Sequence, residues 1–227
     1  MKNPARGAGK AVVLLSGGLD SAVTLYYAAS KGYKCECLVF DYGQRHKKEV
    51  SVAKKIAASC GAPYSVVRFR MPWKGSALLD RHIAVPKGRH IGGGIPATYV
   101  PSRNTVFLSF GASFAETIGA SAVFIGANAV DYSGYPDCRP RYFRIFNELV
   151  KAGTKAGVEN RKIGIKAPLV GMSKADIVKL GRKLGVPFGL TWSCYSGGKR
   201  PCDKCDSCAI RAKGFKEAKA EDPLTTI

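Results

Sequence analysis

Residues 11–27, AVVLLSGGLDSAVTLYY, decide the fold of this chain. Residues 12–15 form a short apolar run that includes β-branched valines, which predicts a buried strand. Two glycines follow, after which residues 21–31 carry apolar side chains at helical spacing and end at Gly32, a natural left-handed cap. The stretch therefore predicts a strand that passes through a glycine turn directly into a helix.

The alternation of strands and helices continues along the chain. Further strands are predicted at residues 35–40, 64–68 and 122–126. Further helices are predicted at residues 46–60, 104–118 and 173–184, and Ser173 with Asp176 forms a capping box for the last. Because this alternation is typical of parallel sheets covered on both faces, the expected fold class is α/β, a Rossmann-like domain over residues 1–190. Residues 191–227 are expected to form a cysteine-rich segment with a C-terminal helix.

Two stretches interrupt this rhythm. Residues 70–103 are rich in Gly and Pro and weakly periodic, which predicts a long functional loop or a partly mobile lid. Residues 129–141 also lack periodicity and follow the carboxyl end of a predicted strand, where ligands bind in open α/β sheets. Both stretches are expected to contribute to a binding site.

The turn SGGLDS, residues 16–21, has the composition of an anion site. Gly17 and Gly18 can adopt positive φ and allow close approach, and the N–H groups of a helix N-terminus attract negative charge. Ser16 and Ser21 add hydroxyl donors. Asp20 fits such a site if it holds a divalent cation that bridges phosphate oxygens, so the turn predicts a site for phosphate with magnesium. The residues expected to line the turn are Leu15, Leu19 and Ala22.

Neither of the two common phosphate-binding loops matches this turn. A Walker A loop requires G-x-x-x-x-G-K-[ST], whereas Gly9-Lys10 precedes the strand and is followed by Ala11. A dinucleotide-binding turn requires G-x-G-x-x-G, which this region lacks. An ordinary tight turn would explain the glycines but not the two serines and the aspartate.

Four cysteines near the C-terminus have the spacing of a metal site. Cys194, Cys202, Cys205 and Cys208 form C-x7-C-x2-C-x2-C, and four thiolates can close a tetrahedral shell around zinc. A ferredoxin-type iron–sulfur run would place its next cysteine at position 212, which is alanine, so zinc is favoured. A closed shell leaves no position for substrate, and the expected role is structural. Among the other cysteines, Cys35, Cys37 and Cys60 fit small core residues, while the role of Cys138 stays open.

The composition is strongly basic. Lys and Arg total 36 against 16 Asp and Glu, a net charge of +20. Such a field attracts anions of any kind, although a solvated cationic surface explains it equally well. No apolar run is long enough for a membrane span and no signal-peptide pattern precedes the first strand, so a cytoplasmic protein without membrane contact is expected.

SGGLDS resembles the PP-loop of ATP pyrophosphatases of the adenine nucleotide alpha hydrolase type, which cleave ATP between its α and β phosphates. Further stretches extend the resemblance, in the same order along the chain, to the 7-cyano-7-deazaguanine synthase family. They are FDYGQRHKKEV (40–50), VPSRN (100–104), GANAVDYSGYPDCR (126–139) and TWSCYSGGKRPCDKCDSCAIRAKGF (191–215). The chain departs from the family at Asp203, where the pattern usually has glycine between the second and third cysteine.

The resemblance implies an ATP-dependent carbon–nitrogen ligase in queuosine and archaeosine biosynthesis. Its substrates would be ATP, ammonia and 7-carboxy-7-deazaguanine, and its product 7-cyano-7-deazaguanine, formed by successive adenylation of the carboxylate and of the amide. The resemblance also implies ATP with magnesium at residues 15–22, zinc at the four cysteines, and a homodimer. The source of the ammonia stays open.

Polar residues near the predicted strand ends are expected to supply the chemistry. Catalytic roles are expected for Asp20, Ser21, Asp41, His46 and Arg103. Substrate contacts are expected for Gln44, Asn104, Asp131, Tyr132, Tyr135 and Asp137. The arginine would clamp a phosphate or carboxylate, the two loop aspartates would accept hydrogen bonds from a guanine-like ring, and the tyrosines would stack on it. The alternatives are a structural histidine, a solvated arginine and loop-stabilising Asx turns.

Two other functions compete with this hypothesis. A PP-loop tRNA-modifying enzyme of the thiolation or lysidine type would use the same turn and suit the +20 charge, but such enzymes usually carry an added RNA-binding domain. A zinc-bearing RNA-binding module would leave SGGLDS unexplained, and it predicts steep salt dependence without ATP turnover. Direct tRNA binding is therefore not expected, although the charge leaves it open.

Overall fold

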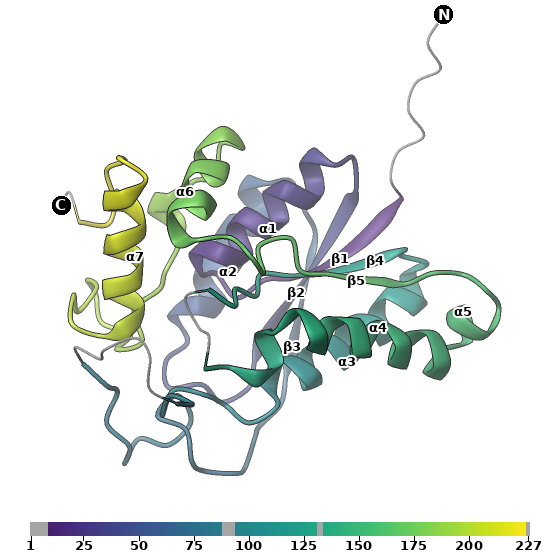
Figure 1. Ribbon diagram of the computed structural model, residues 1–227, viewed down its shortest axis with the longest axis horizontal. Helices are drawn as coiled ribbons and strands as arrows, with labels where there is room; N and C mark the ends of the chain where they lie inside the picture. The colour runs from purple at the N-terminus through teal and green to yellow at the C-terminus, as the bar shows by residue number, and fades with distance from the viewer. Residues whose placement is uncertain (1–8, 88–93, 131–133, 226–227) are drawn as a thin grey trace, which may run out of the picture.

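The fold is built on a five-stranded parallel sheet in the order β3-β2-β1-β4-β5, as a computed structural model shows (Figure 1). The structure describes residues 9–87, 94–130 and 134–225. The strands are β1 (Lys10–Leu14), β2 (Lys34–Asp41), β3 (Tyr64–Arg68), β4 (Ala122–Ile125) and β5 (Gly164–Lys166). Every neighbouring pair is parallel, so the predicted α/β class is confirmed.

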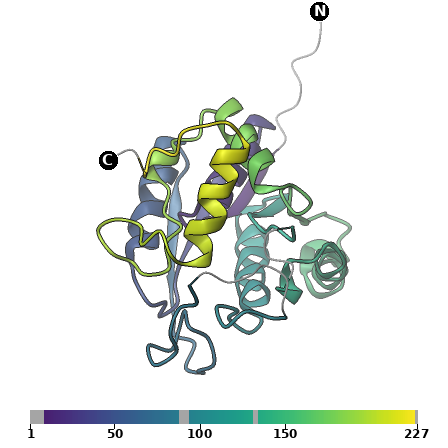
Figure 2. The same cartoon turned by 60° about the vertical axis from the view of Figure 1, so that its left-hand side comes forward.

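Helices cover both faces of this sheet. They are α1 (Leu19–Ser30), α2 (Lys48–Ser59), α3 (Arg103–Ile118), α4 (Pro140–Gly153), α5 (Lys155–Val158), α6 (Lys174–Lys183) and α7 (Asp206–Glu217), with short 3-10 turns η1 (Pro136–Cys138) and η2 (Phe188–Leu190). Successive β1 residues face opposite cores: Val13 packs with α1, α2 and α6, and Val12 packs with α3 and α4. In both views α6 and α7 lie side by side at one end of the molecule (Figures 1 and 2). The central strand is therefore buried on both sides, which explains its unbroken apolar run.

The predicted elements lie where the sequence placed them, with small shifts at their ends. The first helix begins at Leu19 rather than residue 21, and the second spans Lys48–Ser59 rather than residues 46–60. The predicted capping box is confirmed: the Asp176 N–H donates to Ser173 Oγ at 3.2 Å, and that hydroxyl donates to the Asp176 carboxylate at 2.6 Å. The described parts of residues 70–102 contain no helix or sheet strand, as expected.

Two helices and one strand were not predicted, namely α4, α5 and β5. Helix α4 begins at a proline and buries Phe143, Phe146 and Val150 on one face, which is a helical spacing. The division into segments 1–190 and 191–227 remains a prediction. Phe215 and Ala218, from beyond that boundary, pack into the same core as α1. Among the described residues, none of the helices combines the length and the hydropathy that crossing a bilayer requires.

Candidate active site

The phosphate turn, residues 16–21, joins β1 to α1. Gly17 has φ +83°, whereas Gly18 is the N-cap of α1 with φ −75°, so only the first glycine uses the left-handed region. A Cβ on Gly17 would lie 2.6 Å from the Glu49 carbonyl oxygen and 2.9 Å from the Ala53 nitrogen. A glycine is therefore needed at position 17 both for its φ and for the close approach of α2.

Hydroxyl groups hold the turn closed. Ser16 Oγ donates to Ser21 Oγ at 3.1 Å, and Ser21 Oγ donates to the Gly18 carbonyl at 3.0 Å. The Gly18 N–H in turn donates to Ser16 Oγ at 3.3 Å. Among the described residues, no side chain caps the N-terminus of α1, which leaves the N–H groups of its first turn available to an anionic ligand.

Asp20 is paired with a lysine that the sequence analysis did not single out. Lys174, at the start of α6, donates to both Asp20 carboxylate oxygens at 2.7 and 2.8 Å. Its side chain is 8% exposed and that of Asp20 is 17% exposed. The carboxylate expected to hold a cation thus already faces a buried positive charge, and the pair sits directly beside the anion-binding turn.

A cavity opens between the turn and the carboxyl ends of β1, β2 and β4. Its empty volume is about 1480 Å³, which includes space open to solvent. The predicted residues on its wall are Leu15, Ser16, Gly18, Leu19, Asp20, Ser21, Gln44, His46, Arg103, Asn104 and Tyr135. This position matches the crevice at which open α/β sheets bind ligands.

The wall opposite the turn is polar and buried. Arg103, at the start of α3, donates to the Tyr42 hydroxyl at 3.4 Å. Glu49, in the first turn of α2, faces the same arginine, and burial raises the pKa of its carboxyl to about 7 while Arg103 opposes the shift. Cys138 also lines the cavity, and burial raises the pKa of its thiol to about 12, which argues against a thiolate nucleophile.

Several predicted residues support this wall instead of lining it. The buried Asp137 accepts a hydrogen bond from the Asn104 N–H at 3.1 Å, while Asn104 Nδ2 donates to the Asp137 carbonyl at 3.0 Å. Asp41 lies at the end of β2, pairs with Lys47 at 3.2 Å and is not on the cavity wall. Gly17 packs against α2 and Ala22 is buried within α1, so neither lines the cavity. Asp131 and Tyr132 lie outside the described residues.

Two further predicted residues lie on the wall with partly structural roles. Gln44 closes the end of β2, because its Oε1 accepts from the Tyr42 N–H at 2.8 Å and its Nε2 donates to the Phe40 carbonyl at 3.1 Å. His46 packs against Gly197, where a Cβ would lie 2.5 Å from His46 Cβ. Burial lowers the pKa of His46, and its Nδ1 has no hydrogen-bond partner among the described residues.

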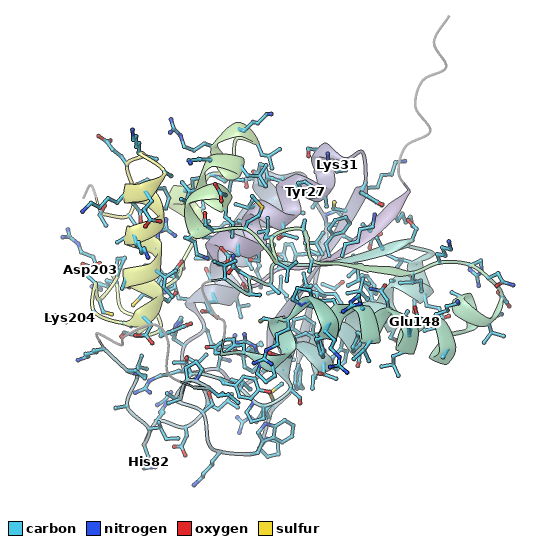
Figure 3. The ribbon with its side chains drawn as sticks, viewed as in Figure 1. Tyr27, Lys31, His82, Glu148, Asp203 and Lys204 are labelled. Carbon is cyan, nitrogen blue, oxygen red and sulfur yellow. The ribbon has the colours of Figure 1, made fainter. Side chains whose placement is uncertain are left out.

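The four predicted metal ligands converge. The Sγ atoms of Cys194, Cys202, Cys205 and Cys208 all lie within 4.8 Å of one another. Sulfurs bound to one tetrahedral ion at ~2.3 Å would be about 3.8 Å apart, so the set fits a metal ion. The Ser196 and Cys202 N–H groups donate to Cys194 Sγ at 3.4 and 3.3 Å, contacts that favour a thiolate. Figure 3 shows Asp203 and Lys204 at the exposed end of this loop.

The cysteine segment, residues 191–225, touches the phosphate turn directly. The Trp192 N–H donates to the Gly17 carbonyl at 2.9 Å, and Trp192 Nε1 donates to the Cys194 carbonyl at 2.9 Å. Lys48 Nζ lies 3.2 Å from the centroid of the Trp192 ring and donates to the carbonyls of Gly198 and Lys199. One tryptophan therefore links a metal ligand to the phosphate turn.

The sequence matches the family described as "Queuosine biosynthesis protein QueC" over residues 10–219, which include the turn, the cavity wall and all four cysteines. The chain belongs to the QueC family. The match confirms the resemblance that the separated motifs indicated.

Curated relatives are identical to this chain at about half of the aligned positions. A protein of Picrophilus torridus named 7-cyano-7-deazaguanine synthase is 54% identical, over 92% of this chain and 88% of its own length. A protein of the same name from Trichodesmium erythraeum is 50% identical, over 95% of this chain and 99% of its own length. The solved U34-tRNA thiolase NcsA from Methanococcus maripaludis with its [4Fe-4S] cluster has a TM-score of 0.49 and 16% identity, over 93% of this chain and 65% of that chain, a likeness too low to bear on function.

Three residues of this QueC-family site were missed by the sequence analysis: Glu49, Lys174 and Trp192. Glu49 lies in the quoted stretch FDYGQRHKKEV, but its position among other charged residues gave no reason to prefer it. Lys174 is adjacent to the capping residue of α6, and a lysine there fits a solvated helix start. Only the packing of α6 against α1 reveals its partner.

Proposed function

We propose that the protein is an ATP-dependent ligase that converts 7-carboxy-7-deazaguanine and ammonia to 7-cyano-7-deazaguanine. One observation carries the proposal: an uncapped phosphate turn, with the buried Asp20–Lys174 pair beside it, opens onto the cavity in a chain of the QueC family. The curated relatives with this name match nearly the whole chain, which supports transfer of the activity.

The proposed reaction consists of two half-reactions, from acid to amide and from amide to nitrile, and both would use the same turn and cavity. ATP transfers AMP to the carboxylate and releases pyrophosphate, and ammonia then displaces AMP to give the amide. A second ATP transfers AMP to the amide oxygen, and loss of AMP and a proton leaves the nitrile. Each half needs one site for pyrophosphate and one for the heterocycle, and the cavity wall includes both the turn and Arg103.

The turn and its neighbours would stabilise the developing charge on the phosphates. The N–H groups of α1 and the two serine hydroxyls would bind phosphate oxygens. Asp20 would hold magnesium, and Lys174 would then be released to neutralise the phosphates. Arg103 would bind the substrate carboxylate on the opposite wall, and Tyr135 would contact the ring. Asp131 and Tyr132 stay predicted ring contacts.

We assign zinc to the four cysteines as a structural ion. When bound, it would fix the loop that carries Trp192, and thereby the backbone of the phosphate turn, without taking part in the reaction. A homodimer, which the family resemblance implies, and a cytoplasmic location, which is an expectation from the sequence, are part of the same proposal.

The test follows pyrophosphate release from ATP and magnesium, with and without 7-carboxy-7-deazaguanine and ammonium, while mass spectrometry follows the heterocycle. The proposal predicts release that depends on the acid, and a product lighter than the acid by the mass difference between a carboxylic acid and a nitrile. Pyrophosphate release that does not depend on the acid but is stimulated by tRNA would instead support a PP-loop tRNA-modifying enzyme. This is the alternative that the +20 charge favours.

A further inference from the structure

Glu49 is a partly exposed carboxylate on the cavity wall, with no side-chain hydrogen-bond partner among the described residues. Only two carboxylates line this cavity among the described residues, Asp20 and Glu49. Asp20 is held by Lys174 at 2.7 Å. Glu49 makes no side-chain hydrogen bond or ion pair within the described parts of the chain. Because no side chain of the described residues holds this carboxylate, it is available to a ligand that enters the cavity.

The position of Glu49 is fixed by α2 and by the phosphate turn. Its carbonyl oxygen packs so closely on Gly17 that no side chain fits between them. Its carboxylate lies in the electrostatic field of Arg103, across the cavity. Glu49 is therefore near the turn through its backbone and near Arg103 through its carboxylate, and all three line the same cavity.

The charged and titratable groups around Glu49 are few. Arg103 faces it from α3 and Tyr42 from the end of β2. His46 and Lys48 belong to its own segment, and Lys48 points to the Trp192 ring. The Asp20–Lys174 pair lies on the turn side of the cavity. Burial raises the pKa of Glu49 to about 7, against the opposing effect of Arg103, so near neutrality this carboxylate can both gain and release a proton.

Both halves of the proposed reaction must remove protons from nitrogen: one when ammonia is converted to the amide, and two when the amide is converted to the nitrile, the first of them as the amide oxygen is adenylated. When ammonia attacks the acyl adenylate, a C–N bond forms, the C–O bond to AMP breaks, and one proton leaves the new ammonium nitrogen. When the adenylated amide collapses to the nitrile, a second C–N π bond forms, the C–O bond to AMP breaks, and the remaining N–H proton leaves. One base close to the reacting carbon is sufficient for both steps.

We propose that Glu49 is this base: its carboxylate accepts a hydrogen bond from ammonia in the cavity and takes up a nitrogen proton in both half-reactions. The inference rests on the proposed function and extends it to a second substrate subsite. His46 is a poorer candidate because it packs on the cysteine segment, where Gly197 covers its ring. Asp137 is a poorer candidate because its carboxylate is held by the Asn104 N–H at 3.1 Å.

The test separates adenylation from the ammonia steps in the full-length protein. Glu49→Gln is assayed for acid-dependent exchange between ATP and labelled pyrophosphate, which needs no ammonia, and for conversion of acid to amide and of amide to nitrile. Glu148→Gln, which changes an exposed glutamate on α4 far from α2, is the control (Figure 3). Because burial disfavours the charged form of Glu49, glutamine is not expected to weaken the fold.

The expected result is exchange within about two-fold of the unmodified protein, with kcat/KM for ammonium lower by about 10²–10⁴-fold, as for loss of a general base. The amide-to-nitrile rate falls by a similar factor. In the unmodified protein the rate rises with pH to a plateau above about 7, since the base must be ionised, and this rise is absent in Glu49→Gln. Glu148→Gln behaves as the unmodified protein.

Two results would overturn the inference alone: Glu49→Gln with an unchanged ammonium step and pH profile, or an equal loss of exchange and conversion, which would make Glu49 a residue that positions ATP. Absence of acid-dependent exchange in the unmodified protein would overturn the proposed function, and this inference with it. The two failures are therefore distinguishable in one experiment.

Discussion

The phosphate turn and the cysteine segment meet at one cavity but are held in place differently. The turn is six residues long, and its shape follows from one glycine with φ +83°, two serine hydroxyls and the start of α1. The cysteine segment has little regular structure before α7 and depends on its sulfur cluster and on a buried Arg211–Asp222 ion pair. A locally determined turn is recognisable in a sequence, whereas the contacts that place the segment against it are not.

The largest effect is expected where the turn contacts α6. Asp20→Asn removes the charge that pairs with Lys174 and, in the proposed reaction, holds magnesium. Acid-dependent pyrophosphate release should fall by about 10²–10³-fold, the range typical of lost electrostatic stabilisation. Asp176→Asn, whose side chain is 54% exposed, is the control and should change the rate by less than about two-fold. Equal rates for both variants would exclude Asp20 from the chemistry.

The next effect tests what holds the cysteine segment. Arg211 donates to the Asp222 carboxylate at 2.6 and 2.8 Å and to the Thr191 hydroxyl at 2.7 Å, all within the protein interior. Because Arg211→Ala removes the guanidinium that neutralises the buried Asp222 carboxylate, the free energy of unfolding should fall by about 3–5 kcal/mol, measured with denaturant. The exposed Arg182→Ala should change it by less than about 0.5 kcal/mol. A similarly small loss in Arg211→Ala would mean that the sulfur cluster alone holds the segment.

A pair of glycine substitutions tests whether the turn is determined locally. Gly17→Ala places a side chain at positive φ and against the backbone of α2, so it should destabilise the protein by about 1–3 kcal/mol or more. Position 18 has φ −75°, and the Cβ added by Gly18→Ala would lie 3.4 Å from Ser16 Oγ and 3.8 Å from the Trp192 carbonyl oxygen, so its effect should stay below about 1 kcal/mol. Thermal unfolding of both variants compares the two positions directly. Equal losses would contradict the assignment of strain to Gly17.

The smallest expected effect lies in the loop between the cysteines. Asp203 adopts φ +54°, a region that favours glycine, which explains why the family pattern has glycine there. Asp203→Gly should raise the free energy of unfolding of the metal-loaded protein by up to about 1 kcal/mol. Lys204→Gly, at the next exposed position without positive φ, should give no gain. A loss in Asp203→Gly would show that the aspartate side chain stabilises the loop.

Much of the fold could be predicted because each element carries its own signal. The buried runs at β1 and β2, the glycine turn and the Ser173 capping box are local features, and all were recognised. The three-residue β5 is too short to produce a pattern, and it forms because β4 offers it an open edge. Its existence could not have been predicted from residues 164–166 alone.

The site was only partly predictable for the same reason. The turn and the four cysteines each occupy one short stretch, and both were found. Asp41 and Asp137 were expected in the site because they follow strands, but their carboxylates are occupied by Lys47 and Asn104. Lys174 lies 154 residues from its partner Asp20, and no local pattern reports such a contact.

The most direct test of the central claim follows the two carboxylate oxygens of the substrate acid into the products. The acid is labelled with ¹⁸O in both carboxylate positions and converted with unlabelled ATP, and AMP, pyrophosphate and nitrile are analysed by mass spectrometry. If the turn directs adenylation of the carboxylate and then of the amide, each nitrile is accompanied by two AMP molecules that carry one ¹⁸O each, and pyrophosphate is unlabelled. Unlabelled AMP, or ¹⁸O in pyrophosphate or phosphate, would contradict the account.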